Sequence, residues 1–159
     1  MKFNGIQWGL VVGAAWVTIL SGGATCQATT FTVNTTSDVD GGTACSLRNA
    51  ITAANRNMPY GGCSAGSSGA IDTIILSNQT YNINNSEGPL GALSDVTIEG
   101  FSSGGSVIVG SVAAGTIFNV NVSLVGSVKL EYLTYRAVRG YTAVQLMSPQ
   151  TLVLNSTTA

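Results

Sequence analysis

The feature that most constrains the fold is a series of short apolar runs between Ile71 and Leu154. Each run holds three to six residues, many of them β-branched, and Gly, Ser or Asn separates it from the next. No helical period is present in this region, so the runs predict β-strands. We expect strands at 73–76, 81–83, 96–98, 107–109, 117–120, 128–133, 143–147 and 152–154.

Similar strands return at a rung-like interval of roughly 20 to 25 residues, which favours a coiled solenoid over a sandwich of hairpins. The intervals from Leu76 to Ile98, from Ile98 to Phe118 and from Leu130 to Val153 all have this length. The interval from Ile98 to Leu130 is longer and requires an inserted loop. The separating residues do not look like the tight Asn-Gly or Asp-Gly turns of hairpins, and by themselves they leave both architectures open.

The composition is consistent with stacked turns of chain, here called rungs. Only 8% of the residues are charged, where about 25% is usual. Rungs bury one face, expose small hydroxyl and amide side chains on the other, and place Gly at the corners. A net charge of −1 without a basic cluster excludes binding to nucleic acid, and the absence of His removes the commonest metal ligand and acid–base group. We therefore expect no metal site and no cofactor.

The N-terminal residues have the order of a secretory signal peptide. Lys2 precedes a mostly apolar run at 8–20, and small residues at 21–24 end it. This run is too short to cross a hydrocarbon core of about 30 Å, so we expect no stable membrane span after cleavage. We expect a secreted or cell-surface protein.

Cleavage after Ala28 satisfies the small-residue requirement and would leave residues 29–159. Cleavage after Ala24 is the alternative, and an uncleaved membrane anchor or a lipidated Cys26 are weaker ones. Removal of the leader leaves two cysteines, Cys45 and Cys63, and an even pair in an exported chain indicates a disulfide. Closing the loop between them would stabilise the fold by roughly 3 kcal/mol.

One short amphipathic helix is predicted at residues 46–56. Ser46 is suited to be its N-cap, and Asn57 and Pro59 are suited to end it. The apolar residues at helical spacing are Leu47, Ala50, Ile51 and Ala54. Because the first rung of a solenoid has an open apolar end, we expect this helix to cover it.

The segment Cys45–Ile51 reads Cys-Ser-Leu-Arg-Asn-Ala-Ile and resembles the CSLREA motif that opens exported parallel β-helix proteins. The blocks that accompany the motif in that family also occur here in order, at 31–34, 38–41, 62–66, 72–74 and 93–100. The resemblance implies an all-β, right-handed parallel β-helix (solenoid) with a pectin-lyase-like fold, about two to three rungs and one short N-terminal capping α-helix. The motif residues are Ser46, Leu47, Arg48, Asn49, Ala50 and Ile51.

We expect the chain to consist of a signal peptide at 1–28, a cap with the disulfide loop at 29–70, and rungs at 71–159. Asn49 replaces the Glu of the family, and we expect it to accept the N–H of the cap less well than Glu would. Residues 151–159 resemble the start of another rung. We therefore expect a fragment of a longer protein, or self-association through an open C-terminal rung.

The acidic side chains after the leader are scattered singly, which gives no lyase-type cluster. Asp38, Asp40 and Gly41 resemble part of a calcium loop but lack its other ligands, so we expect a turn. Glu99 and Glu131 would form a glycosidase-like carboxylate pair only if their strands stacked.

Tyr132 and Tyr135 could stack on sugar rings or belong to the core, and together with Glu99 and Glu131 they are the candidate carbohydrate contacts. Arg48 could be a ligand contact, although an exposed helix arginine paired with Asp38 or Asp40 is the favoured interpretation.

The favoured function is that of an exported, non-enzymatic β-helix segment of a cell-surface or secreted protein that mediates adhesion or polysaccharide contact. The expected partner is a polysaccharide or a host or cell-surface ligand. One alternative is the N-terminal portion of a polysaccharide lyase or glycoside hydrolase. The other is a structural spacer. Parallel β-helices perform all of these functions, so fold alone does not choose between them.

Overall fold

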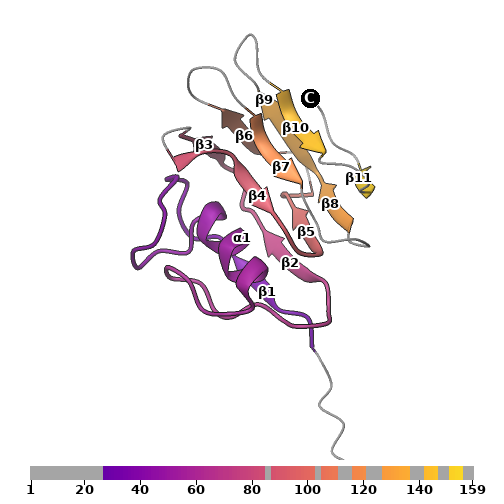
Figure 1. Ribbon diagram of the computed structural model, residues 1–159. Coiled ribbons are helices and arrows are strands. Elements are labelled where there is room, and N and C mark those ends of the chain that lie inside the picture. Colours follow the sequence, from indigo (N-terminus) through magenta and orange to yellow (C-terminus); the bar gives the residue numbers. More distant parts are fainter. Residues whose placement is uncertain are drawn as a thin grey trace, which may run out of the picture.

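A computed structural model describes residues 27–84, 87–102, 105–110, 116–120, 127–136, 142–146 and 151–155 (Figure 1). Residues 1–26 of the predicted leader, with its apolar run, lie outside the described residues. The described chain forms one helix, α1 (Leu47–Arg56), and eleven strands. The strands are β1 (Thr30–Thr32), β2 (Asp72–Ile75), β3 (Thr80–Ile83), β4 (Leu90–Ala92), β5 (Val96–Glu99), β6 (Ser106–Gly110), β7 (Thr116–Val120), β8 (Ser127–Glu131), β9 (Leu133–Arg136), β10 (Thr142–Leu146) and β11 (Thr151–Asn155).

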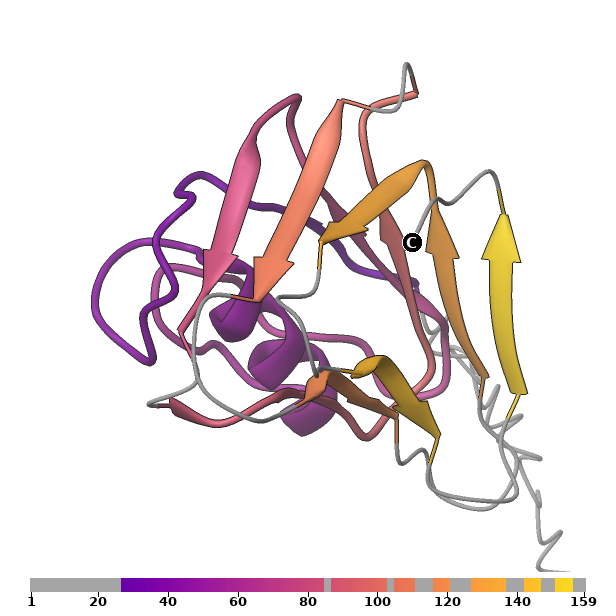
Figure 2. The same ribbon diagram turned by 90° about the horizontal axis from the view of Figure 1, so that it is seen from above.

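All the paired strands are parallel and belong to three sheets. The five-stranded sheet has the order β1-β2-β5-β8-β11, and the two three-stranded sheets have the orders β3-β6-β9 and β10-β7-β4. From β2 onward the chain visits the three sheets in the same order three times, and β11 then rejoins the five-stranded sheet. Seen from above, the sheets lie on different sides of a common interior, although they are not closed on one another (Figure 2). The prediction of a mostly β fold with parallel strands and one helix is confirmed.

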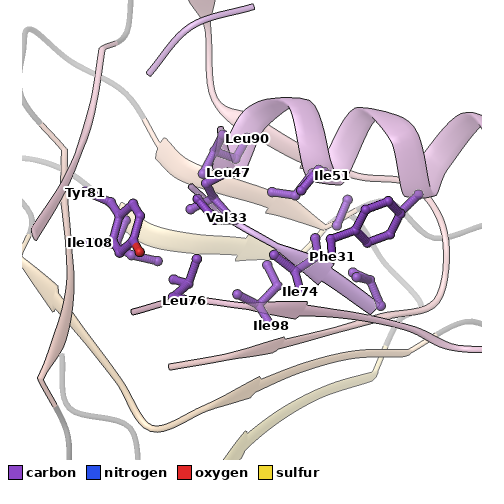
Figure 3. Close-up of a cluster of buried hydrophobic side chains, with 14 of the residues drawn as sticks. Phe31, Val33, Leu47, Ile51, Ile74, Leu76, Tyr81, Leu90, Ile98 and Ile108 are labelled. Atoms are coloured by element: carbon purple, nitrogen blue, oxygen red, sulfur yellow. The ribbon is translucent and has the colours of Figure 1, made fainter. Parts of the chain in front are cut away.

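The core is a set of apolar columns that run through the sheets. Ile74 on β2 lies in register with Ile98 on β5, which lies in register with Leu130 on β8. All three side chains are fully buried, and burial of each contributes roughly 1.5–3 kcal/mol. Figure 3 shows Phe31 of β1 next to Ile74, so the core continues from the cap into the later strands.

Helix α1 packs against β2 and β4, near the β1 end of the sheets (Figure 1). Ser46 is its N-cap, and the Ser46 Oγ accepts the Asn49 N–H at 3.1 Å. Leu47 and Ile51 point from the helix into the core (Figure 3), and Ala50 and Ala54 of the predicted apolar face are buried as well. The helix ends at Asn57, whose backbone is left-handed with φ 51°.

Strand β4 was not predicted from the sequence. Its three residues include Gly91, and Gly and Ala are depleted in strands. Leu90 and Ala92 are nevertheless buried, because α1 packs against this strand. Pairing with β7 and contact with the helix, rather than β-propensity, therefore account for the strand.

The run predicted as one strand at 128–133 is two strands that belong to different sheets. Tyr132 separates β8 from β9 and has a left-handed backbone with φ 54°, which turns the chain from one sheet to the next. Gly100 lies against this corner, and a Cβ at that position would overlap the Tyr132 carbonyl group. A glycine is therefore required where the two corners approach.

The predicted equivalence of Ile98 and Phe118 is wrong. Phe118 lies in the β10-β7-β4 sheet, in register with Leu90 and Val144. The neighbour of Ile98 is Leu130, across the long interval for which an inserted loop was expected. Strands of different sheets have similar apolar patterns here, so spacing alone does not identify the sheet that a strand joins.

Candidate functional site

The predicted disulfide between Cys45 and Cys63 is present and buried. It joins the residue before the helix cap to the loop that follows α1. The Gly62 N–H donates to the Ala44 carbonyl group at 3.1 Å, so backbone and disulfide hold the same two segments together. Both cysteines therefore have a structural role in the described chain.

Arg48 is buried and bound on two sides, which corrects the expectation of an exposed arginine. Its Nε and Nη2 donate to the two carboxylate oxygens of Asp38 at 2.7 and 2.8 Å. Its Nη1 and Nη2 also donate to the carbonyl groups of Glu87 and Gly88, which precede β4. The pairing with Asp38 was one of the two predicted. This arginine connects the loop before α1 to the loop before β4, and the contacts leave it little capacity to bind a ligand.

Asn49 does not take the place of the family glutamate in a capping box. The Ser46 N–H donates to the Ala44 carbonyl group instead, and the Asn49 Oδ1 accepts the Gly41 N–H at 2.8 Å. The Asn49 Nδ2 donates to the carbonyl groups of Gly41 and Ala44 at 2.7 and 2.9 Å. A carboxylate cannot donate these two hydrogen bonds. The polar motif residues Ser46, Arg48 and Asn49 therefore bind other parts of the chain.

The outward surface of the five-stranded sheet presents a different set of polar groups, and we call it the outer face. Because successive strand residues alternate between faces, the neighbours of the buried column point outward. Two in-register rows form the outer face: Thr30, Thr73, Thr97, Lys129 and Val153, and next to them Thr32, Ile75, Glu99, Glu131 and Asn155. Successive residues within a row lie about 4.8 Å apart, which is the separation of adjacent strands.

Glu99 and Glu131 lie in register on the adjacent strands β5 and β8, so the structure satisfies the condition set for their pairing. The Glu131 carboxylate accepts hydrogen bonds from Lys129 Nζ and Asn155 Nδ2, each at 2.9 Å. These bonds, with that from Lys129 the larger cause, lower the pKa of Glu131 below its usual value. Glu131 thus stays ionised at neutral pH, whereas a general acid needs a raised pKa.

The two candidate tyrosines lie in different environments. Tyr135 on β9 is 4% exposed and in register with Ile108 on β6, which is in register with Tyr81 on β3. Burial raises the pKa of the Tyr135 hydroxyl group. Tyr135 is a core residue and cannot stack on a sugar at this surface. Tyr132 is half-buried at the corner next to Glu131.

Two cavities were missed by sequence reasoning. One of about 180 Å³ lies beside α1, and its wall includes Asp40, Arg56 and Tyr60. The Arg56 guanidinium lies 4.8 Å from the Tyr60 ring centroid, and the Tyr60 hydroxyl group donates to Asp40 at 2.9 Å. That hydrogen bond raises the pKa of Tyr60. The spacing of Arg56 and Tyr60, four residues apart next to a predicted helix end, was the available signal.

The second cavity, of about 290 Å³, lies between the end of α1, the start of β2 and the residues just before β5. Its wall includes Asn57, Ser67, Asp72 and Asp95. Asp72 is buried and accepts backbone N–H groups, and Asp95 accepts the Ser127 N–H. Asp72 was regarded only as one of the scattered acids, because nothing in its neighbourhood in the sequence signals burial.

No family model, curated protein or solved structure matches this chain. The resemblance to the CSLREA-type proteins therefore stays a prediction. Among the residues that the structure describes, no helix has the length and apolar character needed to cross a membrane.

Proposed function

We propose that this chain is an exported, non-enzymatic parallel β-helix segment of a cell-surface or secreted protein, and that its outer face contacts polysaccharide. The repeated visit of the chain to three parallel sheets supports a solenoid. The resemblance of 45–51 to the CSLREA motif supports the right-handed form and export.

The outer face supports the polysaccharide contact. Its rows place Thr hydroxyl groups, carboxylates, an ammonium group and an amide on one surface at a regular spacing. These groups donate and accept hydrogen bonds with sugar hydroxyl groups, and a linear polymer can follow rows of this kind. The single observation that carries the proposal is the in-register pair Glu99 and Glu131, which Lys129 and Asn155 extend. Two carboxylates against one ammonium group favour a neutral polymer over a uronate polymer.

The same pair favours a second candidate, a glycoside hydrolase segment. Retaining glycosidases place two carboxyl groups about 5–5.5 Å apart, close to the separation of neighbouring strands. That mechanism requires one carboxyl group to keep its proton near neutral pH. The lowered pKa of Glu131 opposes the acid role for this residue and suits the ionised nucleophile, so Glu99 would have to be the acid of such a pair.

The decisive experiment measures binding of the purified chain to immobilised neutral glucan and to polygalacturonate. We expect binding to the neutral polymer that weakens at least tenfold in Glu99→Gln and Glu131→Gln. Glu87→Gln is the matched control, because Glu87 is an exposed carboxylate in the loop before β4, away from the outer face. If Glu99→Gln and Glu131→Gln bind the neutral polymer as tightly as Glu87→Gln, the outer face is not the binding site.

A test for catalysis uses the same variants. Release of reducing ends from glucan, or of unsaturated products from pectin with calcium, would favour the hydrolase or lyase alternative. If that activity disappears in Glu99→Gln or Glu131→Gln, the non-enzymatic proposal is wrong.

We include self-association in the proposal. In the described chain β11 is the outermost strand of the five-stranded sheet, and an edge strand of this kind can pair with a second copy. Val153 on β11 is 41% exposed. Sedimentation analysis should show an oligomer that Val153→Lys weakens, because a charge at an edge opposes pairing.

A further inference from the structure

Asp72 is a buried carboxylate without a charged partner in the described chain. It is 1% exposed at the start of β2. Its Oδ1 accepts the Thr29 N–H at 2.9 Å, and the Ser67 N–H donates to both of its oxygens, at 3.2 and 3.0 Å. The ion pairs among the described residues involve other carboxylates, those of Asp38 and Glu131. A hydrogen bond from a cation to a carboxylate is about twice as strong as one from a neutral donor.

The backbone nitrogen of Thr29, which donates to Asp72, would become a cation if the peptide bond before it were cleaved. It follows Ala28, after which the sequence predicts cleavage of the leader. We propose that the Ala28–Thr29 bond is the processing site and that the new Thr29 α-ammonium group forms an ion pair with Asp72. This inference rests on the proposed export.

The chemical step is hydrolysis by a signal peptidase during export. The bond between the Ala28 carbonyl carbon and the Thr29 nitrogen breaks, and water supplies a hydroxyl group to the carbon and a hydrogen to the nitrogen. At neutral pH the products are a carboxylate on Ala28 and an ammonium group on Thr29, so no net proton is gained or lost. The hydrogen bond from a neutral amide to Asp72 becomes an ammonium–carboxylate pair.

Thr29 is bonded to the following strands, and Gln27, which this cleavage would remove, also accepts a hydrogen bond from Ser67 Oγ. The Thr73 N–H donates to the Thr29 carbonyl group at 2.9 Å, and β1 begins at the next residue. After cleavage the hydrogen bond from Thr73 would still hold Thr29 beside β2, which also carries Asp72. Cleavage after Ala24 would leave an uncharged amide at Thr29 and no cation beside Asp72.

The experiment exports the full chain and examines the mature product. Mass spectrometry should find Thr29 at the N-terminus. The product then has two amines, the Thr29 α-amine and the Lys129 side chain. In an unfolded chain at pH 7 an α-amine reacts with acylating reagents faster than lysine, by on the order of tens of times, because its pKa is about 7.7–8.0 against 10.4.

In the native protein we expect this preference for the α-amine over Lys129 to shrink at least tenfold. Acylation of Thr29 should be at least tenfold slower than in the unfolded, non-reduced chain, whereas Lys129, whose side chain is 43% exposed, should change little. Asp72→Asn should restore fast acylation of Thr29. Asp95→Asn is the matched control, because Asp95 lines the same cavity but accepts the Ser127 N–H, and it should leave Thr29 protected.

The comparison of native with unfolded wild-type protein tests the ion pair even if Asp72→Asn does not fold. Cleavage before Thr29 with fast native acylation overturns the ion pair and leaves export intact. Cleavage at another bond overturns the assignment of the site, again without contradicting export. A chain that keeps its leader inside the cell overturns both this inference and the proposed export.

Discussion

Two ion pairs in this protein have similar chemistry and different surroundings. The Arg48 and Asp38 side chains are 9% and 1% exposed, and those of Lys129 and Glu131 are 43% and 13% exposed. Arg48 donates to two carboxylate oxygens and two carbonyl groups, and Asp38 also accepts the Asn84 N–H. Lys129 and Glu131 lie on a sheet surface that solvent reaches.

The difference indicates which region serves the fold and which can serve a ligand. Around α1 the polar side chains bind loops of the same chain, so their removal should affect folding. On the outer face the polar side chains lie in rows on regular strands, so their removal should affect binding more than stability. The family-like motif is therefore the structural region, although it is the most recognisable part of the sequence.

The largest expected effect comes from breaking the buried pair. Arg48→Ala leaves the Asp38 carboxylate buried without its cation and should lower the free energy of unfolding by about 3–5 kcal/mol. Denaturant unfolding followed by circular dichroism measures this loss. Arg48→Lys should recover only part of it, because lysine cannot bind both carboxylate oxygens as a fork. A loss below about 1 kcal/mol would make this pair equivalent to a surface pair.

Removal of the disulfide should have the next largest effect. The Cys45→Ala/Cys63→Ala double variant should lose roughly 3 kcal/mol, because the unfolded chain regains the entropy of the loop that the disulfide closes. The same unfolding assay measures it, and the reduced wild-type protein should show a similar loss. If the double variant is as stable as the oxidised protein, the cap is held without the disulfide.

Asn49→Glu introduces the residue of the resembling family and tests the role of the motif. We expect a loss of about 1–3 kcal/mol, because the carbonyl groups of Gly41 and Ala44 lose their donor. Asn49→Asp should also destabilise, because it retains an acceptor for the Gly41 N–H but not the donors. A more stable Asn49→Glu protein would show that a capping box forms after all.

The smallest effect is expected on the outer face. Lys129→Met should raise the pKa of Glu131 toward its ordinary value, because it removes the main cause of the lowering. With a folded pKa below the unfolded one, Glu131 contributes stability at neutral pH that is lost as the pH falls through the folded pKa. That contribution should stay below about 1 kcal/mol.

A carboxyl-carbon NMR titration of Glu131 measures the shift. Asn155→Ala should raise the same pKa by less, because its hydrogen bond is the second cause. An unchanged titration curve in Lys129→Met would mean that the Lys129–Glu131 pair does not persist in solution.

Several elements could be predicted because their signals are local. The helical spacing of Leu47, Ile51 and Ala54, together with the cap at Ser46, predicted α1 to within one residue. The oxidising context predicted the disulfide from the count of cysteines. Strand β4 had no such signal, because its burial depends on contact with α1.

The candidate site was predictable only in part. Glu99 and Glu131 could be named together, since each follows an apolar strand residue, but their register depended on the long interval between β5 and β8. Lys129 and Asn155 were not recognised as partners of Glu131. Tyr132 and Tyr135 looked alike in sequence, and their strand assignments separate a corner residue from a core residue.

By itself the sequence determined the elements whose energetics are local: short strands, one capped helix and a pair of cysteines able to bridge. The tertiary structure decided which strands share a sheet, which carboxylates receive a cation and which polar groups face solvent. The physical reason is that backbone propensity acts over a few residues, whereas burial and electrostatic pairing depend on groups such as Arg48 and Glu87, or Thr29 and Asp72, that only folding brings together.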